Sequence, residues 1–267
     1  MPELPDVELF RRTLDAHALR RTITRVVVSD ARILGDPAKK DFAARLKGNR
    51  LEASRRHGKH LLVQLAHDGW LTLHFGMTGN LRYVEPPADD VPYDRVRLGF
   101  AGGSLVYVNE RMLGRVGLAD DADAFVAAEG LGPDALDPAF DLVALSAALD
   151  GRREVKAVLM DQSVVAGIGN LYADEILFQA RLHPRTPGRT LGKAKRKALS
   201  GKIREVLEIA IDCGAGAERF LERLPKSYLL PQRHDGGACP RCNQKLATLK
   251  AAGRTSYYCP RCQPEPA

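Results

Sequence analysis

The apolar residues of the chain follow two different periodicities. After Pro5, apolar side chains recur every three or four residues through Ala18, which predicts a leading helix within residues 1–20. From about residue 23 to residue 118, short alternating or apolar runs are broken by Gly, Pro and Asp, which predicts several short strands and a β-sandwich or barrel. Helical spacing returns over residues 155–160, 170–179 and 191–211.

A change of composition separates the strand-rich part from the helical part. Residues 119–150 hold eight acidic side chains and no Lys or Arg, with Gly130, Gly132 and Pro133 among them. Such a shift is typical of a connection between domains, so we place a domain boundary here.

The overall charge points to an anionic partner. The net charge is +7, and residues 181–262 hold 18 Lys and Arg against six Asp and Glu. A concentrated basic surface favours nucleic acid, although the Lys-rich segment 193–197 could equally be a solvated helix face. No apolar run reaches the ~20 residues of a membrane helix, and residues 1–8 lack the pattern of a signal peptide. We therefore expect a cytoplasmic protein without a membrane partner.

Four of the five cysteines form two Cys-Pro-Arg-Cys pairs with 16 residues between them. Two such pairs can complete a tetrahedral zinc site, and four thiolates leave no position for water. We expect one structural zinc ion, bound by Cys239, Cys242, Cys259 and Cys262. Disulfides are the alternative, disfavoured in a chain without a secretion signal. A small metal-stapled hairpin usually presents side chains, and Arg254 near its tip is a candidate for a phosphate contact.

The segment 161–174 has the pattern of a helix, a glycine turn and a second helix. Gly167 and Gly169 permit a tight turn and a close approach of the backbone to a ligand. The second helix starts at Asn170, and its free N–H groups could bind a phosphate that Lys156 could also reach. A plain helical hairpin in a protein core is about as compatible with the spacing.

Motifs in several parts of the chain are specific enough to indicate a family. They are Pro2-Glu-Leu-Pro-Asp-Val-Glu8, Arg55-Arg-His-Gly-Lys-His60, His74-Phe-Gly-Met-Thr-Gly79, Leu159-Met-Asp-Gln162, Gly167-Ile-Gly-Asn-Leu-Tyr-Ala-Asp-Glu175 and the cysteine hairpin ending at Gln263. In this order they resemble the formamidopyrimidine-DNA glycosylase / endonuclease VIII family, more closely its formamidopyrimidine branch, over essentially the whole chain. The resemblance implies an α+β protein: a catalytic β-sandwich with a leading helix (1–132), a helix–two-turn–helix DNA-binding domain (133–225) and a zinc finger (226–267).

The resemblance also implies a chemistry at the start of the chain. Pro2 matches the family's nucleophile. Once Met1 is removed, its secondary amine, with a pKa near the ~8 of an α-amino group, is partly unprotonated and can form a Schiff base with the sugar C1′. Glu3 matches the catalytic acid that assists ring opening and shuttles protons.

Two further residues match the catalytic set, and a third candidate, Asp6, departs from it. Lys59 matches a lysine associated with base removal and elimination. Arg254 matches a finger arginine associated with phosphate binding and the second elimination. Asp6 stands where the family commonly has glutamate. The expected reaction is excision of an oxidised base from damaged double-stranded DNA by a monomer, followed by β- or β,δ-elimination.

A base inside a duplex must be flipped out before C1′ is accessible, and a side chain must fill the gap. Met77 and Arg111 match two of the family's three intercalating residues. Leu113 stands at the third position, where phenylalanine is usual, and Tyr93 stands where a DNA-contacting histidine is usual.

The sequence leaves alternatives open for the damaged base that is recognised and for the activity itself. The segment 214–238 is shorter than in the family and lacks the glycine-rich stretch that caps a flipped 8-oxoguanine. We expect 8-oxoguanine and formamidopyrimidines to be favoured, with an oxidised-pyrimidine enzyme like endonuclease VIII as one alternative. The other is a catalytically silent zinc-containing protein that binds damaged DNA. It explains the charge and the zinc, but gives no reason for the catalytic set that begins with Pro2 and Glu3.

Overall fold

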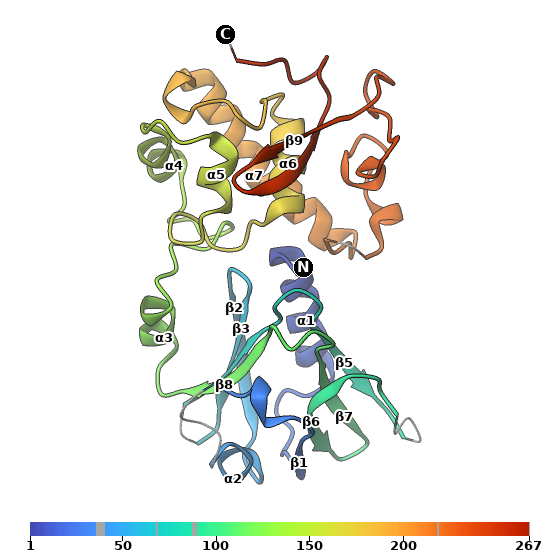
Figure 1. Cartoon of the computed structure of the whole chain (residues 1–267). Coiled ribbons are helices and arrows are strands. Elements are labelled where there is room, and N and C mark those ends of the chain that lie inside the picture. Colours follow the sequence, from blue (N-terminus) through green and yellow to red (C-terminus); the bar gives the residue numbers. More distant parts are fainter. Residues whose placement is uncertain (36–40, 68, 87–89, 218, 267) are drawn as a thin grey trace. The chain divides into compact units, whose positions relative to one another are not determined.

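The computed structural model describes residues 1–35, 41–67, 69–86, 90–217 and 219–266 (Figure 1). The chain divides into two compact units. One contains residues 1–2 and 6–129, and the other contains residues 3–5 and 130–267. Among the described residues, no helix combines the length and the apolar character needed to cross a bilayer. The domain boundaries expected at 132/133 and 225/226 stay predictions.

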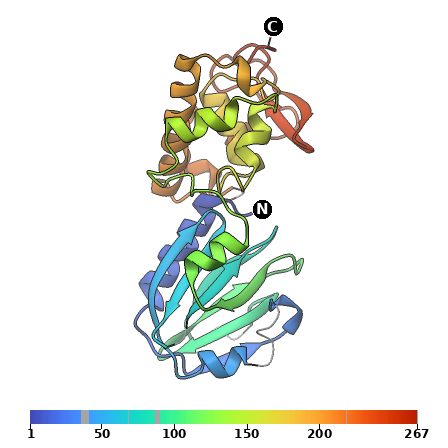
Figure 2. The same cartoon turned by 90° about the vertical axis from the view of Figure 1, so that its left-hand side faces the viewer.

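The first unit is a β-sandwich with a helix running alongside the strands (Figures 1 and 2). Its two four-stranded sheets have the orders β1-β6-β7-β5 and β2-β3-β4-β8, and neighbouring strands are antiparallel. The strands are β1 (Arg25–Val28), β2 (Leu51–His57), β3 (His60–Leu65), β4 (Trp70–His74), β5 (Asn80–Val84), β6 (Asp94–Phe100), β7 (Gly103–Val108) and β8 (Arg115–Ala119). The helices are α1 (Leu4–His17), α2 (Phe42–Leu46), α3 (Ala122–Ala128) and the 3-10 turn η1 (Ala31–Ile33). The predicted sandwich and leading helix are both confirmed.

Alternating side chains explain why these strands form a sandwich. In β3, Leu61, Val63 and Leu65 lie in the core between the sheets, whereas His60 is on the other face. Helix α1 adds Val7, Phe10 and Leu14 to the same core at helical spacing. The outer face of the β2-β3-β4-β8 sheet carries His60 and the buried Leu62, and Phe125 of α3 packs edge-on against His60.

The second unit is a helical domain with a two-stranded hairpin. Its elements are α4 (Leu142–Leu149), α5 (Val155–Met160), α6 (Asn170–Gln179), α7 (Lys193–Asp212), the 3-10 turns η2 (Gly188–Thr190), η3 (Leu221–Arg223) and η4 (Leu230–Gln232), and the strands β9 (Ala247–Ala251) and β10 (Arg254–Tyr258). Helix α6 packs against α5, α7 and β10, and apolar residues of α6 and α7 share one core. Helices α5 and α6 have the bounds that the spacing predicts.

Two helices in the acidic stretch 119–150 were not expected. The Asp121 carboxylate accepts the N–H of Ala124 at the start of α3, and the Asp141 carboxylate accepts those of Val143 and Ala144 at the start of α4. Aspartate is a favoured N-cap because its oxygen satisfies N–H groups that the helix itself leaves free. Part of the acidic character of this stretch therefore comes from helix capping.

Candidate functional site

Glu3 is fixed at the start of helix α6. Its Oε2 accepts the N–H groups of Gly169 (2.8 Å) and Tyr172 (3.1 Å), and its Oε1 accepts that of Leu171 (2.9 Å). These are N–H groups that a helix leaves free at its first turn, where its dipole also favours an anion. The anion at these groups is a carboxylate of the chain itself, which is fully buried.

The two glycines of the turn are needed for this contact. A Cβ on Gly169 would lie 2.4 Å from the Cδ of Glu3, and a Cβ on Gly167 would lie 2.6 Å from the Cδ1 of Leu4. Gly167 also has a φ of +116°, which side chains disfavour. The glycine turn therefore packs closely against residues 3 and 4 of the chain, and the approach to a ligand stays a prediction.

Pro2 directly precedes the anchored carboxylate. Consecutive Cα atoms are ~3.8 Å apart, so fixing Glu3 restricts where the Pro2 nitrogen can lie. Pro2 is half-buried, with Met1 before it, and Asp6 is buried in the first turn of α1. An acidic side chain is favourable at that end of a helix.

Lys156 lies inside a network of polar side chains at α6. The side chain is completely buried, and its Nζ donates to Asp174 Oδ1 (2.6 Å), Asn170 Oδ1 (2.7 Å) and Ser256 Oγ (2.5 Å). An ammonium group has three protons, and all three are used here. Burial lowers the pKa of Lys156, while the adjacent Asp174 acts in the opposite direction. Lys156 thus ties α5 to α6 and to strand β10, and its contact with a phosphate stays a prediction.

The same network holds the hairpin. The Asn170 Nδ2 donates to the carbonyl of Thr255 (3.1 Å), and the Arg233 guanidinium donates to that carbonyl (3.0 Å) and to Asp174 Oδ2 (2.9 Å). Arg254 is exposed beside the turn that joins β9 to β10. The structure thus brings Asn170 and the hairpin strand of Arg254 together in one unit, as a joint phosphate contact would need.

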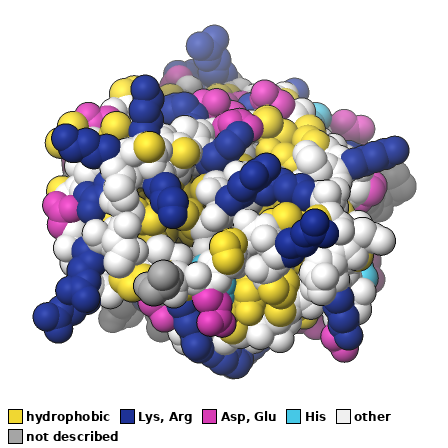
Figure 3. All heavy atoms as spheres, turned by 90° about the horizontal axis from the view of Figure 1, so that it is seen from above, with side chains coloured by type: hydrophobic (Ala, Val, Ile, Leu, Met, Phe, Trp, Pro, Cys, Tyr) yellow, Lys and Arg dark blue, Asp and Glu magenta, His cyan; other side chains and the backbone are white. Residues whose placement is uncertain are grey.

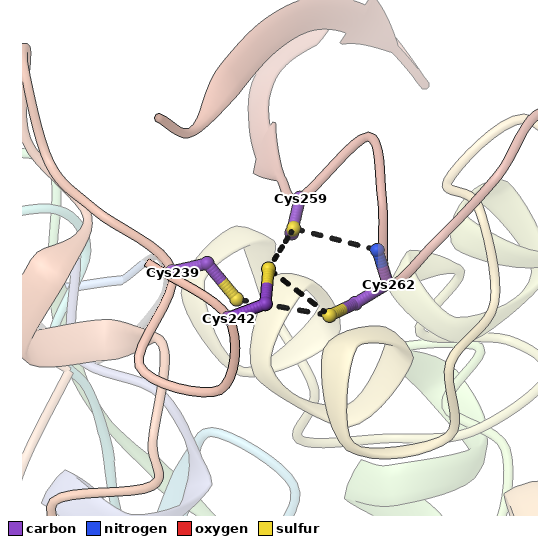
Figure 4. A group of neighbouring side chains, drawn as sticks. All are labelled: Cys239, Cys242, Cys259 and Cys262. Atoms are coloured by element: carbon purple, nitrogen blue, oxygen red, sulfur yellow. Dashed lines mark hydrogen bonds between the residues drawn. The ribbon is translucent and has the colours of Figure 1, made fainter. Parts of the chain in front are cut away.

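The four cysteines converge on one point (Figure 4). Their Sγ atoms are 3.8 Å apart for Cys239 and Cys262, 3.5 Å for Cys242 and Cys259, and 3.6 Å for Cys242 and Cys262. A disulfide would need ~2.05 Å, whereas sulfurs bound at ~2.3 Å around a tetrahedral zinc ion lie just under ~4 Å apart. The donor set and its spacing therefore fit one structural zinc ion.

In the first unit, two loops bring the candidate intercalating residues together. The Arg111 N–H donates to Thr78 Oγ1 (3.2 Å), and Gly76 packs so closely that a Cβ there would lie 2.4 Å from the carbonyl carbon of Leu113. The Met77 and Leu113 side chains are 37% and 51% exposed. Their exposure is what a wedge into a base stack requires.

Tyr93 lies near this pair of loops. Its side chain is 51% exposed and its φ is 61°, and its carbonyl accepts the N–H of Asn109, two residues before Arg111. An exposed aromatic ring beside a wedge can contact a nucleotide.

Lys59 lies in the turn between β2 and β3, next to a pair of buried histidines. The rings of His60 and His74 are 4.7 Å apart. Burial lowers the pKa of His60 to about 3 and that of His74 to about 4, with the Lys59 charge acting in the same direction. Both imidazoles are neutral at physiological pH. They line a cavity of about 480 Å³ with Thr72, Met112, Leu113, Gly114, Arg115, Phe125 and Glu129.

Several residues of the second unit were missed by the sequence analysis. Asp174, Arg233 and Ser256 complete the Lys156 network. Glu175 is buried and accepts the Leu230 N–H (2.8 Å), and burial raises its pKa to about 7. The available signal was the i, i+4 spacing of Asn170 and Asp174, which places both on one face of a helix.

The chain matches known proteins over nearly its whole length. Residues 1–116 match the formamidopyrimidine-DNA glycosylase N-terminal domain, residues 131–221 the formamidopyrimidine-DNA glycosylase H2TH domain, and residues 236–264 the zinc finger found in FPG and IleRS. The formamidopyrimidine-DNA glycosylase of Moorella thermoacetica is 39% identical over 94% of this chain and 95% of that protein. That of Halorhodospira halophila is 38% identical over 98% of this chain and 100% of that protein.

Solved structures agree with these matches. The Lactococcus lactis formamidopyrimidine-DNA glycosylase bound non-covalently to DNA with an AP site has a TM-score of 0.88 and 27% identity, covering 98% of this chain and 100% of that chain. The wild-type L. lactis enzyme with DNA containing N7-benzyl-Fapy-dG also has a TM-score of 0.88, at 29% identity, covering 99% and 100%.

The sandwich, the helical domain and the four-cysteine hairpin together define the class, a zinc-containing DNA glycosylase of base excision repair. Identity above 30% extends over almost all of this chain and of its relatives. The chain belongs to the formamidopyrimidine-DNA glycosylase family.

Proposed function

We propose that this chain excises oxidised bases from double-stranded DNA and then cleaves the strand through a Schiff base on Pro2, after loss of Met1. An AP lyase step of this kind is general to the family. The observation that carries the proposal is the anchoring of Glu3 by three N–H groups at the start of α6. A charged residue so firmly fixed beside Pro2 is what an acid–base partner of a nucleophile requires.

In the first half of the reaction, a bond between C1′ and the Pro2 nitrogen replaces the bond between C1′ and the base. The unprotonated Pro2 nitrogen attacks C1′, the bond from C1′ to the base breaks, and the base leaves with a proton. The sugar ring opens as its O4′ takes up a proton, leaving an iminium ion between Pro2 and C1′. Glu3 lies next in the chain to the nucleophile and is the candidate for moving these protons. Lys59 is the candidate for assisting departure of the base.

The second half uses the acidity that the iminium ion creates. Loss of a proton from C2′ and departure of the 3′ phosphate constitute the β-elimination. A second elimination releases the 5′ phosphate, and hydrolysis of the iminium ion frees Pro2. Arg254 is exposed on a rigid hairpin, so it stabilises the departing phosphates electrostatically, because a guanidinium does not give up its proton readily.

The other proposed contacts with DNA come from residues of each unit. Met77, Arg111 and Leu113 fill the space of the flipped base. Asn170 and Arg254 contact the phosphate backbone, with Lys156 holding Asn170 in place. The partner is damaged double-stranded DNA, the site of action is the cytoplasm, and the domains correspond to residues 1–132, 133–225 and 226–267.

Oxidised purines, 8-oxoguanine and formamidopyrimidines, are the proposed substrates. The relatives and the DNA complexes carry the name of the formamidopyrimidine enzyme. The second candidate is oxidised pyrimidines, which the short connection 214–238 favours, since it holds the turns η3 and η4 but lacks the glycine-rich cap.

Borohydride trapping tests the nucleophile and the lesion together. Zinc-loaded protein lacking Met1 is incubated with duplexes that carry 8-oxoguanine, an oxidised pyrimidine or an abasic site. We expect a covalent adduct on Pro2 with all substrates on which the chain acts, formed faster with 8-oxoguanine. Faster trapping on the pyrimidine duplex would reverse the lesion assignment only.

The variant Pro2→Gly is the matched control. It keeps a free α-amino group but loses the secondary amine, so strand cleavage should fall by at least about tenfold while DNA binding persists. If no adduct forms even with the abasic duplex, the result would favour the alternative function, a catalytically silent protein that binds damaged DNA. An adduct mapped to another residue would refute the assigned nucleophile.

A further inference from the structure

Charge and shape have separate roles in a protein that binds DNA. Figure 3 looks onto the face of the second unit on which the chain ends, at the C mark of Figure 1, and Lys and Arg side chains are distributed over this face. Such charges hold DNA without selecting a position along it. A wedge that enters the base stack acts at one step of the duplex. The chain must therefore fix the wedge relative to the β-sandwich that carries it.

Two buried residues, Tyr107 in β7 and Asn109 just after it, hold the start of the loop that carries Met77. The Tyr107 hydroxyl donates to the carbonyl of His74 (2.8 Å). The Asn109 Nδ2 donates to the carbonyl of Phe75 (3.1 Å) and to the Tyr107 hydroxyl (3.0 Å). Burial raises the pKa of Tyr107, so its hydroxyl keeps the proton that it donates. The end of β4 is thereby tied to the end of β7.

The backbone of Asn109 holds the segment of Tyr93 as well. The Asn109 N–H donates to the carbonyl of Tyr93 (3.0 Å), and the Asn109 carbonyl accepts the Arg95 Nε–H (2.9 Å). The Arg95 guanidinium in turn lies 5.8 Å from the centre of the Tyr93 ring. Because Asn109 is two positions before Arg111, it contacts or adjoins all three segments of this unit that carry candidate DNA contacts.

The backbone beside Leu113 packs directly on the same two side chains. A Cβ on Gly114 would collide with the Tyr107 hydroxyl and with the Asn109 Nδ2. The Tyr107 ring also stacks on the ring of Phe75, with centroids 5.5 Å apart. Since a closely packed interior transmits strain, a change at Tyr107 or Asn109 is passed to the backbone of both loops.

We propose that Tyr107 and Asn109 are positioning residues, which set Met77, Arg111 and Leu113 in the arrangement that enters the base stack. The proposal rests on the proposed function, in which these three side chains fill the space of a flipped base. Buried hydrogen bonds between strand ends make the two loops rigid. A wedge already held in its inserted arrangement loses less conformational entropy when it binds, so the loss of either positioning residue slows insertion.

The fluorescence of 2-aminopurine measures insertion of the wedge without any chemistry. The full zinc-loaded chain is mixed rapidly with a duplex that carries a tetrahydrofuran abasic analogue and a 2-aminopurine beside it. The analogue cannot form a Schiff base, so the signal is independent of Pro2. We expect the insertion rate to fall at least about fivefold in Tyr107→Phe and in Asn109→Ala, because each removes a hydrogen bond that ties the Met77 loop to β7.

Two control variants accompany these substitutions. Tyr83→Phe removes a tyrosine hydroxyl from the same sheet, where it accepts a hydrogen bond from Arg21 and does not contact a wedge loop. Val63→Ala lowers the stability of the same unit from within its core, so it shows whether lost stability alone slows insertion. Both controls should insert at the rate of the unmodified chain.

A double-mutant cycle separates positioning from a general effect on stability. Leu113→Ala shortens the wedge, and if Tyr107 acts through Leu113, the two substitutions together should slow insertion less than their separate effects predict. Fully additive effects, equal rates in Tyr107→Phe and Tyr83→Phe, or equal slowing in Val63→Ala would each overturn the proposal.

The same measurement distinguishes this proposal from the proposed nucleophile. An unmodified chain that gives no insertion signal would overturn the positioning role, whatever the result of borohydride trapping. An insertion signal that Tyr107→Phe slows, in a chain that forms no adduct on Pro2, would refute the nucleophile alone and support the positioning role.

Discussion

Glu3 and Gly169 are in direct contact although 166 positions separate them in the sequence: the Gly169 N–H donates to the Glu3 Oε2 at 2.8 Å. Gly169 has extended backbone angles that any residue could adopt. The reason for glycine here is therefore space, because a Cβ would meet the carboxyl carbon of Glu3 at 2.4 Å. The residue beside the proposed nucleophile is thus positioned by a turn in another part of the chain.

Gly169→Ala should displace Glu3 and leave the fold largely intact. We expect the rate of Schiff-base trapping on an abasic duplex to fall at least about tenfold, as catalytic groups tolerate little displacement. Gly201→Ala is the control, since a Cβ there meets nothing within 4 Å. Equal trapping rates in the two variants would show that the position of Glu3 is not needed.

Lys156→Met should destabilise the helical unit strongly. The substitution removes the ammonium partner of the buried Asp174, which keeps its ion pair with Arg233, so the loss should approach but not exceed the cost of about 3–5 kcal/mol for a buried pair broken from one side. The free energy of unfolding is measured with urea, from the helical circular dichroism signal. Lys202→Met removes a solvent-exposed pair with Glu205 and should change stability by less than about 1 kcal/mol. A similarly small effect of Lys156→Met would contradict the importance of the buried network.

Acidification should destabilise the β-sandwich through His60. The folded state lowers the pKa of His60 from 6.5 to about 3, so between these values the unfolded chain binds a proton that the folded chain does not. Stability is therefore highest above the ordinary pKa and falls as the pH drops, by about 2 kcal/mol at about pH 5 from this group. The single tryptophan, Trp70 on β4, reports unfolding of this unit by fluorescence.

His60→Phe isolates that contribution. The variant keeps an aromatic ring beside Phe125 but cannot be protonated, so its stability should change less between about pH 7 and about pH 5. The exposed His17 gives the control substitution, His17→Phe, for which the pH dependence should follow that of the unmodified chain. An unchanged slope in His60→Phe would assign the effect to other groups.

Removal of zinc should weaken DNA binding by releasing the hairpin. We expect one zinc ion per chain, lost on treatment with a strong chelator and in Cys239→Ser. Affinity for an abasic duplex should then fall at least about tenfold, because the hairpin cannot bury enough surface to stay folded without the metal. Zinc content and fluorescence anisotropy measure the two effects. Cys213→Ser, outside the cluster, should retain both. Full affinity without zinc would refute this role of the finger.

Local patterns were sufficient to predict much of the fold. Helix α6 runs from Asn170 to Gln179 as its apolar spacing indicates, and the paired cysteines predict their cluster because the ligand geometry is encoded in the Cys-x-x-Cys spacing. The short helices α3 and α4 were not predicted. Their Asp caps at 121 and 141 were visible in the sequence, but seven or eight residues give too little periodicity to identify a helix.

Contacts between distant parts of the chain could not be predicted from local patterns. Lys156 has the charge of a phosphate ligand, but Asp174 and Ser256 surround it, the second from 100 positions away. Likewise, the N–H groups of α6 suited an anion, and the anion is the carboxylate of Glu3. In both cases the partner within the chain was not predicted, since a partner distant in sequence leaves no local pattern.

The anchoring of residues 3–5 in the second unit has a consequence for biosynthesis. These residues are made first, yet the amides that fix Glu3 follow 166 to 169 positions later. At roughly 5–20 residues per second, a ribosome needs on the order of ten seconds or more to supply them. The β-sandwich can therefore fold during translation while the segment beside Pro2 is still without its anchor. Glu3, beside the proposed nucleophile, gains its hydrogen-bond partners only after the turn before α6 has been made. A truncated chain that ends within the β-sandwich would therefore carry Pro2 beside a Glu3 that is not held in place.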